Sequence, residues 1–326
     1  MSDFEFRQNE ITKQWMVLAP RRAKRSNENG KTVMLCPFCV GNEDDREELY
    51  RVPRPLPNPL PSMNSGQALK GEGTISSWLV RVIANKFPFA DHHELIIHSP
   101  DHHKNFDELP FSHVELLLQT YRARVRANVQ HGKVYLFHNR GHAGGESMPH
   151  PHTQLVVVPH HVQVATKAPK EPWFERLLST PRNSSHAATL DKREILETDH
   201  FLVFCPPTSE WPDEVWVEPQ MNGKSFAEIS DVEISDLAFV MARLVQLFSL
   251  RHFDEFPFNI YITPGNNWYL RLVPRAKILG GFELATGIMV NTQDPAETFS
   301  FLKEHFWRPD HTLIMGVHQA SYARKV

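Results

Sequence analysis

An internal repeat is the feature of this sequence that most limits its fold. In the first copy, a strand-like segment at 94–97 precedes residues 104–109 and a helical pattern. In the second copy, a segment at 214–217 precedes residues 224–229 and another helical pattern. Both pairs of segments align at an offset of 120, since 214 − 94 and 226 − 106 give the same number. A shared offset over several elements indicates duplication of one supersecondary unit.

Each copy predicts one helix followed by two strands. Apolar residues recur at helical spacing in both helices, and Gly132 is expected to end the first one. Capping boxes are expected at the two helix starts, Ser112 with Glu115 and Ser230 with Glu233. The predicted strands are 134–137 with 155–158 in the first copy and 260–262 with 270–273 in the second; Pro159 and Pro274 end the second strand of each pair.

A duplicated strand–helix–strand–strand unit predicts an α+β fold, in which two antiparallel half-sheets join into one larger sheet with flanking helices. We expect an N-terminal half over residues 1–180 and a C-terminal half over residues 181–326. The length of 326 residues is sufficient for two such halves.

Charge and composition exclude several classes of function. The net charge is −3, which predicts no basic surface for nucleic acid. No uninterrupted apolar run approaches the roughly 20 residues that span a bilayer. The first residues lack the pattern of a secretory signal, and three cysteines do not suggest a disulfide framework. We therefore expect a soluble cytoplasmic protein.

The segment from Gly144 to Gln154 carries the residues most suited to chemistry. Residues two apart in an extended chain share a face, so His150, His152 and Gln154 are expected to project the same way. Pro151 stiffens the link between the two imidazoles. Such a row can bind a metal or present an imidazole nucleophile, and we interpret it as serving both purposes.

Cys36 and Cys39 form a C-x-x-C turn, which suits either tetrahedral zinc or a redox pair. Zinc is the preferred interpretation, because no thioredoxin-like βαβ pattern surrounds Cys36. The missing ligands are expected from the segment 99–103 and from His150. Such a site ties distant segments together, which indicates a structural metal.

The chain resembles the galactose-1-phosphate uridylyltransferase family, a branch of the histidine-triad superfamily, over nearly its whole length. The segments that carry the resemblance are 14–25, Cys36-Pro37-Phe38-Cys39, 84–88, 99–102, 137–141, the block from Ser147 to Gln154, and 280–283. The resemblance implies a fold of two histidine-triad-like halves, in agreement with the repeat.

The resemblance also implies an enzyme that transfers a nucleotidyl group by a ping-pong mechanism. His152 would be the nucleophile on the α-phosphorus of a nucleotide sugar, releasing a sugar 1-phosphate. It implies further roles for matched positions: Gln154 and Ser147 as hydrogen-bond donors, Arg22 and Arg25 at the phosphates, Asn85 and Asn139 in the nucleotide pocket, Lys277 and Glu283 at the sugar phosphate, and Cys36, Cys39, His102 and His150 as zinc ligands. The backbone of Gly144 and Gly145 could form an anion-binding nest. A homodimer is expected from the family.

Two positions depart from the family pattern. Glu146 stands where a small residue is usual, and it would repel phosphate unless it points away. The second-half strand at 268–273 has no histidines, so we expect no second, iron-type metal site.

Three functions remain open. The first is a UDP-glucose:hexose-1-phosphate uridylyltransferase of galactose metabolism. The second is an ADP-glucose phosphorylase or adenylyltransferase that uses the same histidine. The segment 280–287 looks closer to such enzymes than to the uridylyltransferases. The third is a non-catalytic nucleotide-binding protein.

Overall fold

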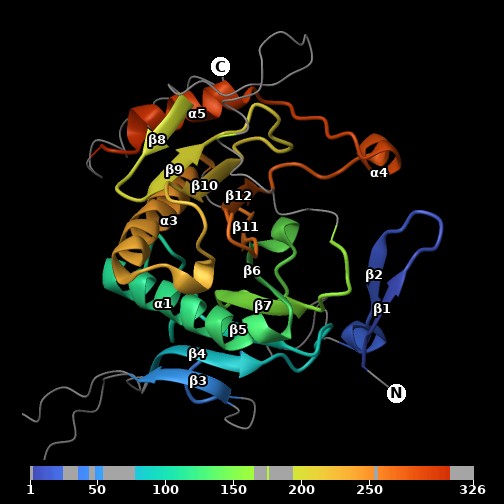
Figure 1. The fold of residues 1–326 in the computed structure, drawn as a ribbon. Helices are drawn as coiled ribbons and strands as arrows, with labels where there is room; N and C mark the ends of the chain where they lie inside the picture. The colour runs from blue at the N-terminus through green and yellow to red at the C-terminus, as the bar shows by residue number, and fades with distance from the viewer. Residues whose placement is uncertain are drawn as a thin grey trace, which may run out of the picture.

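The computed structural model describes residues 3–24, 36–43, 48–53, 78–164, 175, 194–252 and 256–308. Within these ranges, ten strands form one antiparallel sheet (Figure 1). Their spatial order is β3 (Glu48–Pro53), β4 (Trp78–Ala84), β5 (His93–Ile97), β7 (His152–Val158), β6 (Lys133–Arg140), β11 (Phe258–Ile262), β12 (Leu270–Pro274), β10 (Val215–Pro219), β9 (Phe201–Phe204) and β8 (Ile195–Glu197). The expected boundary between residues 180 and 181 lies outside the described residues, as does Arg25.

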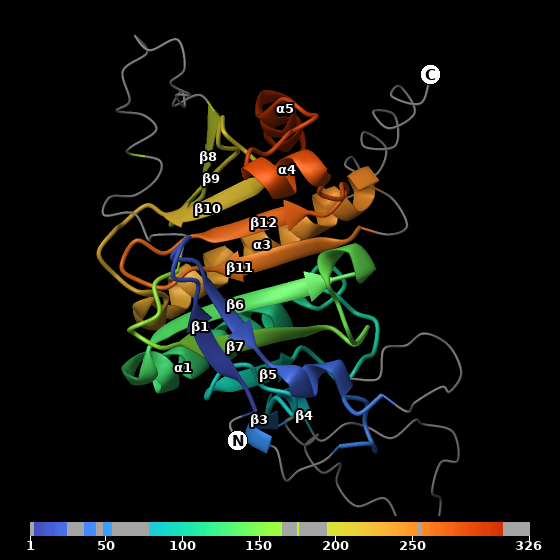
Figure 2. The ribbon, with the colours of Figure 1, turned by 90° about the vertical axis from the view of Figure 1, so that its right-hand side faces the viewer.

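Helices α1 and α3 cover one face of this sheet, and the opposite face has no long helix among the described residues (Figures 1 and 2). A hairpin, β1 (Glu5–Gln8) and β2 (Trp15–Leu18), crosses in front of that opposite face. The helical segments are α1 (Phe111–Asn128), α3 (Asp231–His252), α4 (Gly281–Thr286), α5 (Pro295–His305), and the short 3-10 helices η1 (Pro20–Lys24), η3 (Val129–His131), η4 (His142–Gly144) and η6 (Phe226–Glu228). No described helix is both long and apolar enough to cross a membrane.

The strand order confirms the predicted α+β fold. The units β5–α1–β6–β7 and β10–α3–β11–β12 each contribute three neighbouring strands, and they meet where β6 pairs with β11. At that junction Asn139 lies opposite Asn259, its counterpart 120 residues later. The four outer strands, β3 and β4 at one edge and β8 and β9 at the other, were not predicted from the repeat.

The offset of 120 residues does not hold for the equivalent strands β5 and β10. Glu94 accepts hydrogen bonds from Arg124 and Asn128 of α1, so it faces the helices. Glu214 instead accepts a hydrogen bond from the Trp216 indole and pairs with Arg271 on the opposite face. The constant offset of 120 is therefore wrong for β5 and β10, because side chains on successive strand residues alternate between faces.

The two helix starts differ. Ser230 donates from its backbone and its hydroxyl to the Glu233 carboxylate at 2.7 and 2.6 Å, which confirms the second capping box. The first one was predicted wrongly, since α1 already begins at Phe111, after Pro110, with no side-chain cap. Ser112 therefore lies inside the first turn. Gly132 follows the 3-10 helix η3, which extends α1.

The main core lies between the sheet and the two long helices. Alternate residues of each strand point into it, such as Leu136 of β6 and Leu155 of β7, which are 2 and 0% exposed. The intervening residues of each strand, such as Gln154 of β7, project from the opposite face of the sheet. That uncovered face therefore holds the chemistry-bearing side chains of both halves.

Candidate active site and metal centre

His152 is the first residue of β7 and lies at the centre of the candidate site. It pairs with Ile97 of β5, and Gln154 pairs with Leu95 of β5 and Phe137 of β6. Both side chains lie on the uncovered face and are largely buried, at 5 and 7% exposure. Strands on both sides therefore position Gln154, while His152 is paired with β5.

The hydrogen bond of the His152 ring identifies its reactive nitrogen. Nδ1 of His152 lies 2.9 Å from the carbonyl oxygen of His150. A carbonyl can only accept, so Nδ1 carries the proton and Nε2 carries the lone pair. The ring packs edge-on against Phe38, with centroids 5.4 Å apart. A neutral imidazole held in this tautomer presents Nε2 as a nucleophile.

His150 precedes the strand, because β7 starts two residues later. Its ring points at the cysteine turn, with Nδ1 at 3.7 Å from Cys36 Sγ and 3.6 Å from Cys39 Sγ. The predicted row of three extended residues thus holds for His152 and Gln154 only. The chain bends over residues 147–150, before β7 begins. The His150 imidazole therefore faces the cysteines, while the His152 imidazole projects from the strand.

The ligand atoms of Cys36, Cys39, His102 and His150 lie within 4.8 Å of one another. His102 Nδ1 is 3.2 Å from Cys39 Sγ, and the neighbouring His103 is exposed. Tetrahedral zinc bonds of about 2.3 Å to sulfur and about 2.0 Å to nitrogen place ligands roughly 3.5 Å apart. The four spacings fit a cation of this size, and the two-thiol, two-imidazole set suits zinc.

Two further observations support a metal at this cluster. Nε2 of His150 donates to the Ser99 carbonyl at 2.8 Å, so its Nδ1 lone pair faces the thiols. Burial, followed by the charge of Cys36, raises the pKa of the Cys39 thiol to about 11. The Cys39 thiol therefore stays protonated near neutral pH unless a cation compensates its thiolate.

The cluster joins three segments that are far apart in the sequence. The turn 36–43 packs its Phe38 onto a small apolar cluster with Trp78, Leu95 and Ile97 on the uncovered face. His102 follows β5, and His150 precedes β7. A metal held here would fix the backbone carbonyl of His150 that orients the nucleophile.

The glycine turn before His150 uses its own amides internally. The backbone N–H groups of Gly144 and Gly145 donate to the carbonyls of Gly141 and His142, each at 3.0 Å. The anion-binding nest expected at these two glycines is therefore not formed in this conformation. Glu146 turns back, and its carboxylate accepts from the Gly141 N–H at 2.8 Å. It thus closes the turn instead of facing a phosphate.

The turn is also tied to the second half of the chain. Asn259 Nδ2 donates to the Gly144 carbonyl at 2.7 Å and to Asn139 Oδ1 at 2.9 Å. Asn139 Nδ2 in turn reaches the Gly145 carbonyl at 3.5 Å. The side chain of Ser147, two residues further on, is exposed.

His93 is a site residue that the sequence did not single out. It is 4% exposed, and its Nε2 lies 3.0 Å from Gln154 Oε1 and 2.9 Å from Asn85 Nδ2. It thus joins two predicted site residues. His93 lies on β5 opposite Val156, two pairs along from Leu95, which lies opposite Gln154. Its side chain therefore shares the face of Gln154, but the register that brings the two together is not visible in the sequence.

Arg22 lies beside this group. Its guanidinium donates to the Phe87 carbonyl at 2.6 Å and lies 4.8 Å from the centre of the Phe89 ring. Phe89 itself packs on His93, with centroids 4.4 Å apart. The N-terminal segment therefore brings a cation to the edge of the group formed by Asn85, His93 and Gln154.

Lys277 and Glu283 pair with each other, with Nζ at 2.8 Å from Oε1. Glu283 also accepts from the Gly280 N–H at the start of α4. Helix α4 lies on the uncovered side of the sheet, away from its strands (Figures 1 and 2). The described contacts join these two residues to each other but do not link them to His152.

Comparison with known proteins finds relatives with a similar sequence around this site. The family model described as "Galactose-1-phosphate uridyl transferase, N-terminal domain" matches residues 90–161, which include His152 and four of the predicted ligand and donor positions, His102, Ser147, His150 and Gln154. A galactose-1-phosphate uridylyltransferase of Thermotoga maritima is 27% identical over 78% of this chain and 78% of its own length. The chain is thus similar to galactose-1-phosphate uridylyltransferases, both in this segment and over most of its length. These similarities support an enzyme of the nucleotidyltransferase type.

A relative with another printed activity is as similar and matches more of the chain. ADP-glucose phosphorylase of Arabidopsis thaliana is 26% identical over 92% of both chains. A crystal structure of an Arabidopsis thaliana ADP-glucose phosphorylase with bound ADP-glucose superposes with a TM-score of 0.62 at 23% identity, covering 92% of this chain and 99% of that one. The two comparisons support the predicted fold and leave two substrate classes to be separated.

Proposed function

We propose that this enzyme transfers a nucleoside monophosphate from a nucleotide sugar to a phosphate acceptor through His152. Nε2 attacks the α-phosphorus, the bond to the sugar phosphate breaks, and a sugar 1-phosphate leaves. An oxygen of the acceptor phosphate then attacks the same phosphorus, and the phosphorus–nitrogen bond breaks to restore neutral imidazole. The observation that carries this proposal is the His152–His150 hydrogen bond, which leaves the lone pair on Nε2.

The remaining site residues have supporting roles in this proposal. Charge develops on the non-bridging oxygens of the α-phosphate, so fixed donors there lower the barrier. Gln154 and Ser147 would act as donors, with Asn85 and Asn139 lining the nucleotide pocket. Arg22 and Arg25 would meet the phosphates, while Lys277 and Glu283 would contact the sugar phosphate. Zinc held by Cys36, Cys39, His102 and His150 would be structural.

Two substrate classes follow from the relatives. The first candidate is UDP-glucose:hexose-1-phosphate uridylyltransferase, supported by the family model and the Thermotoga maritima relative. The second is ADP-glucose phosphorylase, supported by the Arabidopsis thaliana relative, whose match spans 92% of both chains. In either case we propose a cytoplasmic homodimer with an N-terminal catalytic half and a C-terminal half that contributes to the sugar-phosphate site.

Isotope exchange tests the proposal. Labelled glucose 1-phosphate should enter UDP-glucose or ADP-glucose without a third substrate, because the first half-reaction is reversible. His152→Ala should abolish this exchange. The nucleotide sugar that exchanges faster identifies the base. The acceptor is identified by comparing the transfer rates to galactose 1-phosphate and to inorganic phosphate. Nucleotide binding without exchange of either nucleotide sugar would instead support a non-catalytic nucleotide-binding protein.

A further inference from the structure

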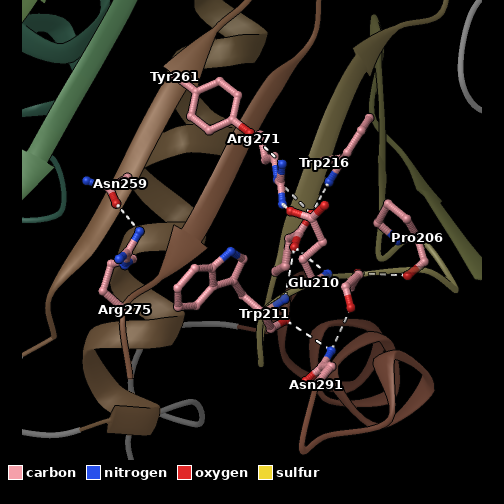
Figure 3. Close-up of polar contacts among 11 residues, drawn as sticks. Pro206, Glu210, Trp211, Trp216, Asn259, Tyr261, Arg271, Arg275 and Asn291 are labelled. Carbon is pink, nitrogen blue, oxygen red and sulfur yellow. Dashed lines mark hydrogen bonds and ion pairs between the residues drawn. The ribbon is translucent and has the colours of Figure 1, made fainter. Parts of the chain in front are cut away.

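Two arginines of β12 and its end lie on the uncovered face but have opposite surroundings (Figure 3). Arg271 Nε pairs with Glu214 at 2.7 Å, and its Nη2 pairs with Glu210 at 3.0 Å. Although burial opposes it, the pairing with Glu214 raises the pKa of Arg271. Arg271 is thus a neutralised, structural cation.

Arg275 has no such counter-ion among the described residues. Its guanidinium lies 4.1 Å from the centre of the Trp211 ring, and its Nη1 donates to Asn259 Oδ1 at a long 3.4 Å. Its Nε is buried without a hydrogen-bond partner in the described part of the chain. A half-buried guanidinium with neutral neighbours is costly, and it becomes favourable when an anion completes its hydrogen bonds.

The sheet register places Arg275 on the same face as the nucleophile. Asn139 of β6 lies opposite Asn259 of β11, which lies opposite Val273 of β12. The Arg275 N–H continues the ladder by donating to the Pro257 carbonyl at 2.7 Å. Two residues beyond Val273, Arg275 therefore returns to the uncovered face.

Asn259 links Arg275 to the reactive half. The same side chain that accepts from Arg275 donates to the Gly144 carbonyl and to Asn139. An anion on Arg275 would lie beside the glycine turn that leads to His150 and His152. The segment from Arg275 then continues directly to Lys277.

We propose that Arg275, stacked on Trp211 and oriented by Asn259, binds the phosphate dianion of the second substrate. This inference rests on the proposed function and deepens it by naming a recognition residue for the acceptor. Sugar 1-phosphates and inorganic phosphate share this chemistry, since both offer oxygens to a planar guanidinium.

Calorimetric titration of the full chain with glucose 1-phosphate, inorganic phosphate and glucose tests this site. Wild type should bind one or both phosphate compounds but not glucose, and the tighter of the two identifies the source. Arg275→Gln should weaken that binding by about 10-fold to 100-fold, the contribution of a charge-assisted hydrogen bond. Arg275→Lys keeps the charge and should lose less. Binding of UMP or AMP should change less than about 2-fold.

Arg126→Gln is the matched control, because this arginine also has a neutral partner, the Ala227 carbonyl, but lies on α1. It should bind phosphate as wild type does. If Arg275→Gln does not fold, a several-fold weakening in Arg275→Lys still supports the site. Equal phosphate affinity in wild type and the folded Arg275 variants, or no phosphate binding by wild type, would overturn it. Because these titrations require no turnover, absent exchange activity would count against the proposed function alone.

Discussion

Gly144→Ala should disturb the turn that precedes the reactive histidine. A Cβ at this buried position would lie 2.9 Å from the Phe258 carbonyl oxygen and 3.6 Å from Asn259 Nδ2. The nearest atom belongs to the backbone of β11, so it cannot rotate away. Overpacking of this kind costs about 1–3 kcal/mol. Stretching the Asn259–Gly144 hydrogen bond would add about 0.5–1.5 kcal/mol.

Thermal unfolding measures this cost, at roughly 2–4 °C for each kcal/mol in a chain of this size class. Gly281→Ala is the control for stability, because a Cβ there meets no atom within 4 Å and the residue begins α4. We expect Gly144→Ala to unfold several degrees lower and to lose exchange activity, while Gly281→Ala unfolds at or slightly above the wild-type temperature. Equal unfolding temperatures for the two variants would refute the close contact between the turn and β11.

Two other perturbations test the metal centre and the core behind the nucleophile. Elemental analysis should find about one zinc per chain. Removal of the zinc by a strong chelator, or by Cys39→Ser, should lower both the unfolding temperature and the exchange rate. A metal-free wild type with unchanged stability would exclude a structural zinc. Burial lowers the pKa of His138 to about 3, while its Nδ1 donates to the His152 carbonyl. Because the unfolded ring titrates near 6.5, its stabilising effect is complete above pH 6.5 and is lost as the pH falls toward 3. Between pH 7 and 5 the wild type should therefore lose about 2 kcal/mol more unfolding free energy than His138→Phe, measured by urea denaturation. Equal losses would show that His138 is not buried as a neutral ring.

The duplicated architecture was predictable because its signals are local. Helical periodicity, apolar strands and strand-ending prolines recur in both copies, and the capping box at Ser230 is formed by neighbouring side chains. The failures came where tertiary context decides. Pro110 starts α1 before Ser112 can cap it, and a change of offset puts Glu94 and Glu214 on opposite faces.

The site was predictable to a similar degree. Spacing and resemblance gave Cys36, Cys39, His102 and His150, whose ligand atoms lie together in the structure. Partners across strands were not predictable from spacing, because the register that sets them is a property of the whole sheet. His93 beside Gln154 and Arg275 beside Asn259 are examples. The glycine turn likewise uses its amides internally, which its sequence does not reveal.

Mass spectrometry of the enzyme after incubation with UDP-glucose or ADP-glucose, quenched in base, tests the central claim most directly. We expect one nucleoside monophosphate per active site, acid-labile and bonded to His152, and its loss when sugar 1-phosphate or phosphate is added. No adduct under conditions of active exchange, or an adduct on another residue, would contradict the assignment of His152 Nε2 as the nucleophile.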